Sequence, residues 1–507
     1  MNRLPGAARL SLVLATVLSL ALPAAAHDLV LRGGRVMDPE TGLDAVRDVG
    51  IDGNRITAIS EAPLDGERVI DATGRVVAPG FIDAHLHGVT PIAYKLALRD
   101  GLTTAMDLEF GTLGTRVDGW YAERAGRTQV NYGTASSHEL ARSLVLDGIE
   151  AKDVSEAPLS RSQGTRWADG VPTDKEFAAI MATIDAGLAA GAIGLGSTVG
   201  YLPGASAREL YEAQKVAARY GRLSAVHTRH TPGTATTTPN GIQEMLANAV
   251  SLGAPAIVMH FNNPGWELVQ DLLLGLRSEG HNVWGEIYPY AAGSTTLNAA
   301  FFRPEVYEEQ LGKRYEDTLF DPATQTFYTK ARYLETVAKD PARPVIVYKM
   351  PPEQIPAWLR MEGITMGSDG MPIDGRYGWA TSFEALPAMH PRGAGARGRS
   401  LRLAREHDIP LMHVLAALSY RTAKHLGDTG LAAMRERGRL QEGMVADIVV
   451  FDPEAVTDHA SYAESTRPTT GIDYVLVGGR VTVDGGRVRG DVFAGEAIRF
   501  PPGAAGS

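Results

Sequence analysis

Short apolar runs alternate with longer amphipathic segments through the middle of the chain. Each run is bounded by turn residues, which predicts buried strands, whereas apolar positions recur every three or four residues in the segments between them, which predicts helices. The predicted strands are Leu102–Leu108, Ile193–Ser197, Leu223–His227, Ala256–His260, Val283–Tyr288, Val345–Tyr348 and Ile364–Ser368. The predicted helices are Asp174–Ala190, Ala207–Tyr220, Gly241–Leu252 and Trp266–Arg277.

Strand–helix alternation over about 350 residues predicts parallel strands that are joined by crossover helices. A (β/α)8 barrel of the TIM type accommodates this pattern most economically. A doubly wound open sheet is the alternative, but no Gly-rich phosphate loop follows the first strand, and this disfavours it.

The two ends of the chain share a different sequence pattern, in which short predicted strands are separated by tight turns. Asp28–Val36 and Val49–Ile59 have this pattern near the start, and Ala446–Phe451 and Tyr474–Val483 have it near the end. The tetrapeptide Gly-Gly-Arg-Val occurs at 33–36, 478–481 and 485–488. We therefore predict one small β-sandwich-like domain built from residues 27–79 and 438–500, beside a barrel at 80–437.

Residues 1–26 have the pattern of a secretory signal peptide. Arg3 and Arg9 precede a short apolar segment from Leu10 to Leu22, and small residues end at Ala26. The sequence thus predicts cleavage after Ala26, a secreted or periplasmic protein, and no stable membrane association after removal of the signal. A retained N-terminal anchor is the alternative.

Composition narrows the possible chemistry. The chain of 507 residues has a formal net charge of -10 and no basic run, which argues against a nucleic-acid partner and leaves a small-molecule substrate. It contains no cysteine. Any metal ion must therefore be held by histidine, aspartate, glutamate or a modified lysine.

The stretch Val76–Thr90 contains the first candidate metal ligands. After a Pro-Gly pair it carries Asp83, His85 and His87. Alternate side chains of a strand point to the same face, so the two imidazoles can hold one metal ion from one direction.

Ligand-type residues also end several later strands. Because the carboxyl ends of all barrel strands meet on one face, these residues are predicted to converge on a site for Zn²⁺ or another divalent ion. An Asp in the Gly-Ser-Asp turn could take a proton from a metal-activated water, although a turn-forming role is the alternative. The residues concerned are Asp107 and Glu109, His227, His260 and Asp369.

These residues and their neighbours resemble the amidohydrolase superfamily, and more narrowly its D-aminoacylase (N-acyl-D-amino-acid deacylase) group. The resemblance covers residues 28 to 485. The matching stretches are VVAPGFIDAHLH, GAIGLGSTVGYLPGA at 191–205, VHTRH at 226–230, EIYPY at 286–290, TMGSDG at 365–370, HPR at 390–392 and GRLQEGMVADIVVFDP at 438–453.

The resemblance implies a distorted (β/α)8 barrel with a flanking β domain, one or two zinc ions, and N-acyl-D-amino acids as substrates. It implies that His85, His87, His227, His260 and Asp369 hold metal and that Asp369 is also the catalytic carboxylate. Arg229, in an H-x-R pattern, would hold the substrate carboxylate. Tyr201, Tyr288, Arg392 and His138 would line the same pocket.

Two departures from the group affect these expectations. Glu109, with Asp107 as the alternative, stands at the strand end where the group has a cysteine, so it could bridge two metals or bind one. His260-Phe261-Asn262 replaces the group's His-His-Lys, which weakens the case for an acidic substrate side chain. The strand-borne Lys349 is interpreted as a surface lysine.

The sequence therefore predicts a secreted, metal-dependent amide hydrolase that removes the acyl group from N-acyl-D-amino acids. A dipeptidase or cyclic-amide hydrolase on the same scaffold is the first alternative. A non-catalytic binding protein on an inactive barrel is the second, and it is disfavoured because every expected ligand position is filled.

Overall fold

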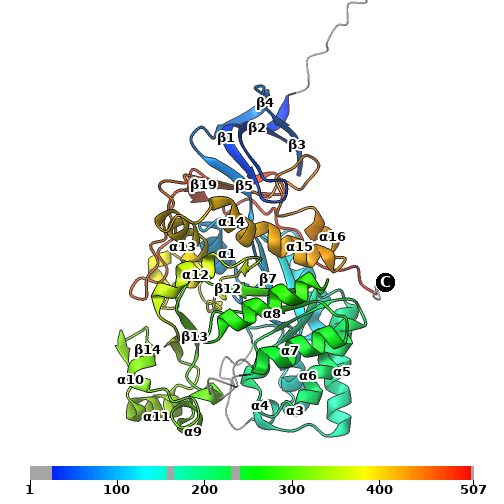
Figure 1. Cartoon of the computed structure of the whole chain (residues 1–507), viewed down its shortest axis with the longest axis vertical. Coiled ribbons are helices and arrows are strands. Elements are labelled where there is room, and N and C mark those ends of the chain that lie inside the picture. The colour runs from blue at the N-terminus through cyan, green and yellow to red at the C-terminus, as the bar shows by residue number, and fades with distance from the viewer. Residues whose placement is uncertain (1–25, 157–164, 230–239, 504–507) are drawn as a thin grey trace, which may run out of the picture.

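The central feature of the computed structural model is an eight-stranded parallel sheet that curls into a nearly closed barrel (Figure 1). The structure describes residues 26–156, 165–229 and 240–503. Just beyond the two edge strands the Asp369 N–H donates to the carbonyl of His85 at 2.7 Å, which draws the edges together. The barrel strands are β6 (Phe81–Asp83), β7 (Leu102–Thr112), β8 (Asn131–Ser137), β9 (Gly194–Ser197), β10 (Leu223–Val226), β11 (Ala256–Val258), β12 (Val283–Ile287) and β17 (Thr365–Met366).

Helices surround this barrel and confirm the predicted alternation. The predicted helix at Asp174–Ala190 is α5, where the Thr173 hydroxyl accepts from the Glu176 N–H and the Glu176 carboxylate accepts from the Thr173 N–H. The helices are α1 (Pro91–Leu98), α2 (Val117–Arg124), α3 (His138–Asp147), α4 (Arg166–Asp169), α5 (Asp174–Ala189), α6 (Ala207–Ala218), α7 (Asn240–Ser251), α8 (Trp266–Ser278), α9 (Pro304–Tyr307), α10 (Tyr315–Thr318), α11 (Lys330–Lys339), α12 (Ile355–Leu359), α13 (Arg392–Glu406), α14 (Leu411–Leu415), α15 (Arg421–Asp428) and α16 (Ala432–Arg435).

One barrel strand was predicted wrongly and another was missed. The apolar run Val345–Tyr348 belongs to a separate four-stranded antiparallel sheet made of β13 (Ala292–Thr296), β14 (Leu319–Asp321), β15 (Thr326–Phe327) and β16 (Pro344–Tyr348). The missing barrel strand is β8, whose sequence NYGTASS is polar although every residue in it is buried. Hydroxyl and amide groups inside the barrel wall are paired with hydrogen bonds, so an apolar-run criterion does not find this strand.

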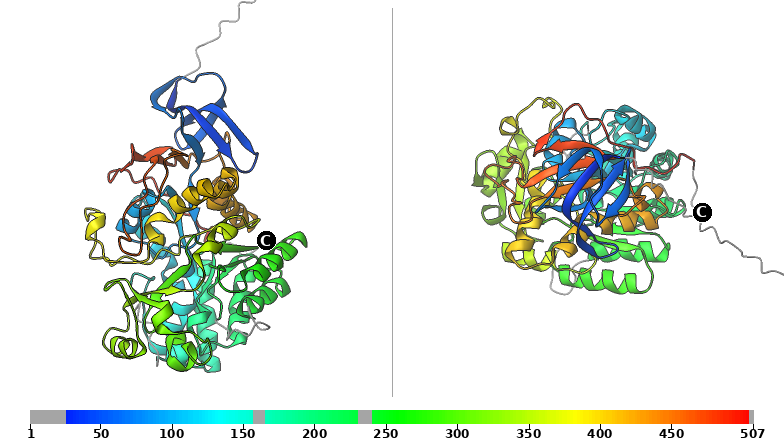
Figure 2. Two further views of the ribbon diagram at one scale, coloured as in Figure 1. Left: turned by 60° about the vertical axis from the view of Figure 1, so that its left-hand side comes forward. Right: turned by 90° about the horizontal axis from the view of Figure 1, so that it is seen from above.

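Strands from both ends of the chain form one sheet, as predicted. Its order is β21-β20-β19-β18-β5-β1-β2-β3, with β4 paired to β1. The antiparallel pair β5–β18 joins the two ends, and Figure 2 shows the blue and orange-red strands side by side. The strands are β1 (His27–Asp38), β2 (Leu43–Asp52), β3 (Arg55–Ser60), β4 (Gly66–Asp71), β5 (Val76–Pro79), β18 (Ile448–Phe451), β19 (Ile472–Val477), β20 (Arg480–Asp484) and β21 (Arg487–Val488).

The last part of the predicted 438–500 β segment leaves this sheet. The Ile498 N–H donates to the Tyr132 carbonyl at 2.8 Å, and the Phe500 N–H donates to Gly191 at 3.0 Å. Ile498 is fully buried in a cluster that includes Met106 of β7. The tail therefore packs against the barrel, because its apolar side chains complete the barrel's core.

Residues 1–25 of the predicted signal peptide lie outside the described residues. Of the helices in the described ranges, none combines the length and the apolar character that a membrane crossing requires.

Candidate active site and metal centre

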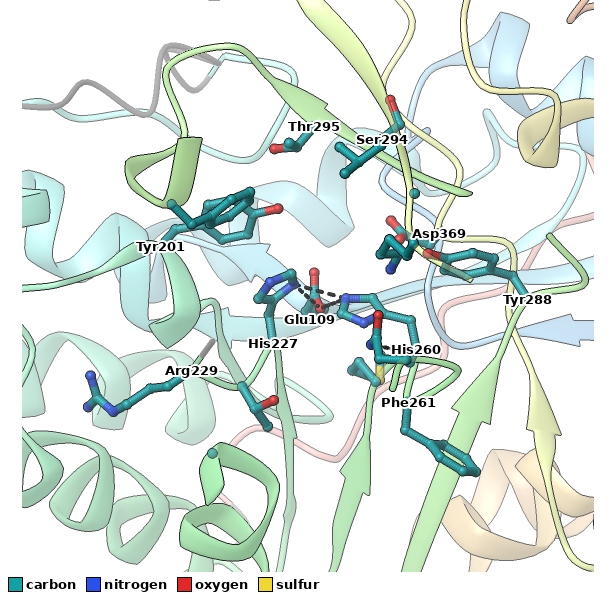
Figure 3. Close-up of a pocket in the computed structure, with 18 of the residues that line it drawn as sticks. Glu109, Tyr201, His227, Arg229, His260, Phe261, Tyr288, Ser294, Thr295 and Asp369 are labelled. Atoms are coloured by element: carbon teal, nitrogen blue, oxygen red, sulfur yellow. Dashed lines mark hydrogen bonds and ion pairs between the residues drawn. The ribbon is translucent and has the colours of Figure 1, made fainter. Parts of the chain in front are cut away.

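The buried carboxylate of Glu109 lies between two pairs of histidines, of which Figure 3 shows His227 and His260. Its Oε2 is 3.3 Å from His85 Nε2 and 3.5 Å from His87 Nε2. Its Oε1 is 3.3 Å from His227 Nδ1 and 3.0 Å from His260 Nε2. One carboxylate therefore offers an oxygen to each histidine pair, and the structure brings together residues that lie far apart in the sequence.

Local irregularity of β7 directs Glu109 into this position. The register of β7 against β8 shifts between Asp107 and Thr112, the form of a β-bulge, which re-aims side chains next to active sites. On β9, which is separated from β7 by β8 in the sheet, a Cβ at Gly196 would lie 2.7 Å from the Glu109 carbonyl oxygen. Glycine at 196 therefore permits the close approach of β7 that places Glu109 at the centre.

Asp369 completes the side of the cluster that holds the first histidine pair. Its Oδ1 is 3.5 Å from both His85 Nε2 and His87 Nε2, and its Oδ2 is 2.9 Å from Arg392 Nη1. Asp369 has a φ of 50° and His260 a φ of 32°, in the left-handed region that L-residues rarely adopt. Such backbone strain is concentrated at functional sites.

Two further carboxylates support the first histidine pair from behind. His85 Nδ1 donates to Glu286 Oε2 at 2.8 Å, and His87 Nδ1 lies 3.2 Å from Asp107 Oδ1. A carboxylate on the far nitrogen orients the ring and leaves Nε2 available as a ligand. Asp107 therefore acts behind the ligands, and Glu286 is a site residue that the sequence analysis missed, although a charge within the buried strand of EIYPY was a usable signal.

Asp83, the first polar residue of the Val76–Thr90 stretch, turns away from the cluster. It accepts from the His85 N–H at 2.9 Å and from the Ser368 hydroxyl at 2.6 Å, and it also pairs with Arg397. These contacts join the loop after β6 to the loop that carries Asp369. Asp83 therefore positions two candidate ligands without being one.

The charges of the cluster fit a divalent cation. Burial opposes protonation of the imidazoles, yet the nearby carboxylates raise the pKa of His85 well above its usual value and that of His87 to about 9. Burial likewise opposes ionisation of Glu109, but the surrounding imidazoles lower its pKa well below the usual range.

The geometry of the donor atoms agrees with this charge pattern. Within the described residues two sets have ligand atoms that all lie within 4.8 Å of one another: His85, Glu109 and His260, and His85, His87 and Asp369. The buried atoms Glu109 Oε1 and His260 Nδ1 have no hydrogen-bond partner there. Imidazole and carboxylate donors of this kind suit zinc.

A cavity of about 410 Å³ opens over the cluster, and the predicted pocket residues Tyr201, Tyr288, Arg229 and Arg392 all line it. The Tyr201 ring centroid is 4.5 Å from that of His227. Arg229 has a different orientation: its guanidinium points away from the histidines in Figure 3, and its Nε donates to Glu244 at 3.0 Å. The predicted carboxylate anchor is thus already paired with a protein carboxylate.

His138 does not lie in the pocket, contrary to the sequence-based expectation. Its side chain is fully buried, with Nδ1 2.9 Å from Ser197 Oγ and Nε2 2.8 Å from Glu209 Oε1. Arg142 Nη1 also donates to Glu209, at 2.6 Å. The H-x-x-x-R pattern therefore forms an internal ion-pair network, and we withdraw His138 from the substrate-binding residues.

Lys349 is not the surface residue that the sequence suggested. It directly follows β16 and lines the cavity together with Ser294 and Thr295 of β13. The antiparallel sheet that contains β13 and β16 therefore contributes one wall of the pocket. The sequence analysis did not predict this wall, because it assigned Val345–Tyr348 to the barrel.

Comparison with known proteins agrees with this geometry. The model of the amidohydrolase family matches residues 68–195 and 318–483, more than half of the chain. The N-acyl-D-glutamate deacylase of Alcaligenes xylosoxydans xylosoxydans is 31% identical over 484 residues, which cover 89% of this chain and 93% of that protein.

Solved structures show the same architecture. A D-aminoacylase crystal structure superposes with a TM-score of 0.75 at 24% identity and covers 94% of this chain and 100% of its own. The N-acyl-D-glutamate deacylase of Bordetella bronchiseptica, solved with zinc and a phosphonate inhibitor, gives a TM-score of 0.72 at 25% identity, with 94% and 100% covered. This chain therefore has the fold of these enzymes.

Proposed function

This chain belongs to the amidohydrolase family, and on that premise we propose that it is a metal-dependent amide hydrolase that removes the acyl group from N-acyl-D-amino acids. The observation that carries the proposal is the placement of Glu109 between two histidine pairs, with Asp369 at the edge, on the floor of a cavity. The similarity to N-acyl-D-glutamate deacylase supports the substrate class.

Zinc is the metal that we propose for this centre, held by His85, His87, His227, His260, Glu109 and Asp369. The zinc in the similar Bordetella bronchiseptica structure and the nitrogen and oxygen donors present here both support this choice. Because each Glu109 oxygen faces a different histidine pair, Glu109 would be a ligand common to both pairs. When bound, zinc supplies Lewis acidity that polarises a carbonyl group and lowers the pKa of water.

Asp369 carries the proton transfers in this proposal. Burial disfavours its charged form, but Arg392 and His85 outweigh this effect and lower its pKa, so the carboxylate is ionised and can accept a proton. It takes a proton from the attacking water and delivers it to the amine that leaves, so the acid product and the free amino acid are released. Arg392, 2.9 Å from Oδ2, orients the carboxylate for both steps.

Export from the cytoplasm remains part of the proposal. The charged start, the apolar segment Leu10 to Leu22 and the small residues before His27 support a cleaved signal peptide and a periplasmic or secreted location. N-terminal sequencing of the protein from a bacterial periplasmic fraction tests this, because a chain that starts at Met1 would contradict it.

One combined measurement tests the enzymatic proposal. Metal content is determined on the purified protein, and turnover is measured on N-acetyl-D- and N-acetyl-L-amino acids, dipeptides and hydantoins. We expect bound zinc and hydrolysis that is confined to the N-acetyl-D-amino acids. Hydrolysis of only dipeptides or hydantoins would favour the alternative enzymes, and a metal-free protein without turnover would contradict catalysis.

A further inference from the structure

Lys349 is a cation at the wall of the pocket without a partner among the described residues. Its ammonium makes no hydrogen bond there and has no carboxylate within ion-pair distance. Its Nζ lies over the ring of Tyr288, 5.5 Å from the centroid. A lysine so placed differs from a surface lysine, whose ammonium is fully hydrated.

Arg392 contacts the same tyrosine ring. Its Cζ is 4.7 Å from the Tyr288 centroid, and the side chain is almost completely buried. Among the described residues its Nε has no hydrogen-bond partner, its Nη1 is paired with Asp369 Oδ2 at 2.9 Å, and its Nη2 donates to the Ser294 carbonyl at 3.4 Å. Within the described ranges Asp369 is the carboxylate in ion-pair contact with it, and Asp369 also faces the histidines. Two cations therefore contact one ring, and Asp369 is the one described carboxylate that pairs with either of them.

Gly293 provides the room in which these groups meet. A Cβ at this position would lie 3.0 Å from Lys349 Cε, 3.2 Å from Lys349 Nζ and 3.2 Å from Tyr288 Oη. Contacts of 3.0 Å are tighter than those of most real side chains. Glycine at 293 thus lets the lysine ammonium and the tyrosine hydroxyl approach the same point in the cavity wall.

The surroundings of Lys349 disfavour the protonated form of its side chain, but do not remove its charge at neutral pH. Burial, together with the nearby Arg392, lowers its pKa to about 8, so that the ammonium is still largely protonated at neutral pH. Placing an unpaired charge in a partly buried wall is costly, and an anion that enters the cavity removes this cost.

We propose that Lys349, together with Arg392, binds a carboxylate group of the substrate. The inference rests on the proposed deacylase function and names a binding residue for it. The Arg229 guanidinium is directed away from the histidines and is paired with Glu244, so the carboxylate is held from the Tyr288 side of the cavity instead. The carboxylate is either the α-carboxylate of the amino acid or one on its side chain.

Three substrates that differ only in which carboxylate is amidated separate these sources. N-acetyl-D-glutamate has both carboxylates, N-acetyl-D-glutamine only the α-carboxylate, and N-acetyl-D-isoglutamine only the side-chain carboxylate. kcat and KM are measured for the wild type and for Lys349→Met, which removes the charge and keeps the length of the side chain. A compound that is not turned over is measured by its inhibition constant.

We expect the substitution to lower kcat/KM, mainly through KM, by about 10- to 100-fold for the compounds that carry the bound carboxylate. A loss on glutamate and glutamine alone identifies the α-carboxylate. A loss on glutamate and isoglutamine alone identifies the side-chain carboxylate. An equal effect on all three compounds, or no effect, overturns the inference.

Two further variants separate a binding role from a structural one. Lys349→Arg keeps the charge and is expected to recover part of the loss in the affected compounds. Lys339→Met removes an exposed lysine on α11 that pairs with Glu335, and we expect wild-type kinetics. If the wild type hydrolyses and binds none of the compounds, both the deacylase function and this inference fail. If it hydrolyses them and Lys349→Met is unchanged, this inference alone fails.

Discussion

Two buried clusters of histidine and carboxylate lie in this barrel, and they differ in how their charges are balanced. Around Glu109 the contacts within the described residues are imidazoles alone, with no arginine or lysine. Around Glu209, Arg142 Nη1 donates to both carboxylate oxygens, at 2.6 and 2.7 Å. His138 Nε2 lies 2.8 Å from Glu209 Oε1.

The difference shows which cluster is prepared for a ligand. Both carboxylates are almost completely inaccessible to solvent. Glu209 has the counter-charge of Arg142, whereas Glu109 Oε1 faces only imidazole nitrogens and accepts no hydrogen bond from the described residues. A cluster whose polar atoms are all paired with one another has a structural role. A cluster that has unpaired ligand atoms next to a cavity fits a metal ion. Residue types alone do not distinguish the two.

The largest effect is expected for Asp369→Asn. An amide cannot accept the proton from water, so we expect kcat to fall about 1000-fold while the metal content measured by mass spectrometry stays near that of the wild type. Asp374→Asn, an exposed aspartate in the same loop, is the matched control and should keep full activity. Near-normal turnover of Asp369→Asn would remove it from the catalytic role.

Glu109→Gln tests the carboxylate at the centre of the comparison. The substitution removes the negative charge between the histidine pairs, and we expect zinc affinity, measured by competition with a chelator, to fall by more than about 100-fold. Activity should fall with the loss of metal. Unchanged zinc affinity and stoichiometry would show that Glu109 is not a ligand.

Glu286→Gln examines the support behind His85. Removing a carboxylate that orients a metal-binding imidazole typically lowers metal affinity or activity by about 10- to 100-fold, and we expect an effect of this size. The control is Glu279→Gln, an exposed residue that follows α8. If the two variants behave alike in zinc titration and turnover, the Glu286 contact has no role in the site.

Glu209→Gln should affect stability and leave the chemistry intact. It leaves the buried Arg142 without its counter-charge, which we expect to lower the free energy of unfolding by about 3–5 kcal/mol. Urea denaturation measures this value, while zinc content and kcat of the folded variant should match the wild type. A specific loss of zinc from this variant would abolish the distinction between the clusters.

The expected fold followed from local patterns wherever burial and periodicity agree. The helices α5 to α8 begin and end within two residues of the predicted bounds, and most barrel strands overlap the predicted ranges, because an amphipathic period is a local property. The run at 345–348 has the same apolar pattern as a barrel strand, but its hydrogen bonds join β13 and β14. Burial alone does not specify which neighbour a strand pairs with.

The candidate site divides in the same way. His85 and His87 were predictable because alternation along one strand sets their common direction, and the ends of parallel strands set their meeting point with His227, His260 and Asp369. Which polar residues would support them was not predictable. Glu286 is 201 positions from His85, and no local pattern reports a contact over that separation.

The sequence by itself determined most of the apolar strands, which strands end in metal-ligand side chains, and the family to which the chain belongs. Only the tertiary structure decided how the charges are paired: Arg142 with Glu209, Arg229 with Glu244, and Lys349 with no carboxylate among the described residues. The physical reason is that periodicity depends on neighbours along the chain, whereas the partner of a buried charge depends on how distant elements pack.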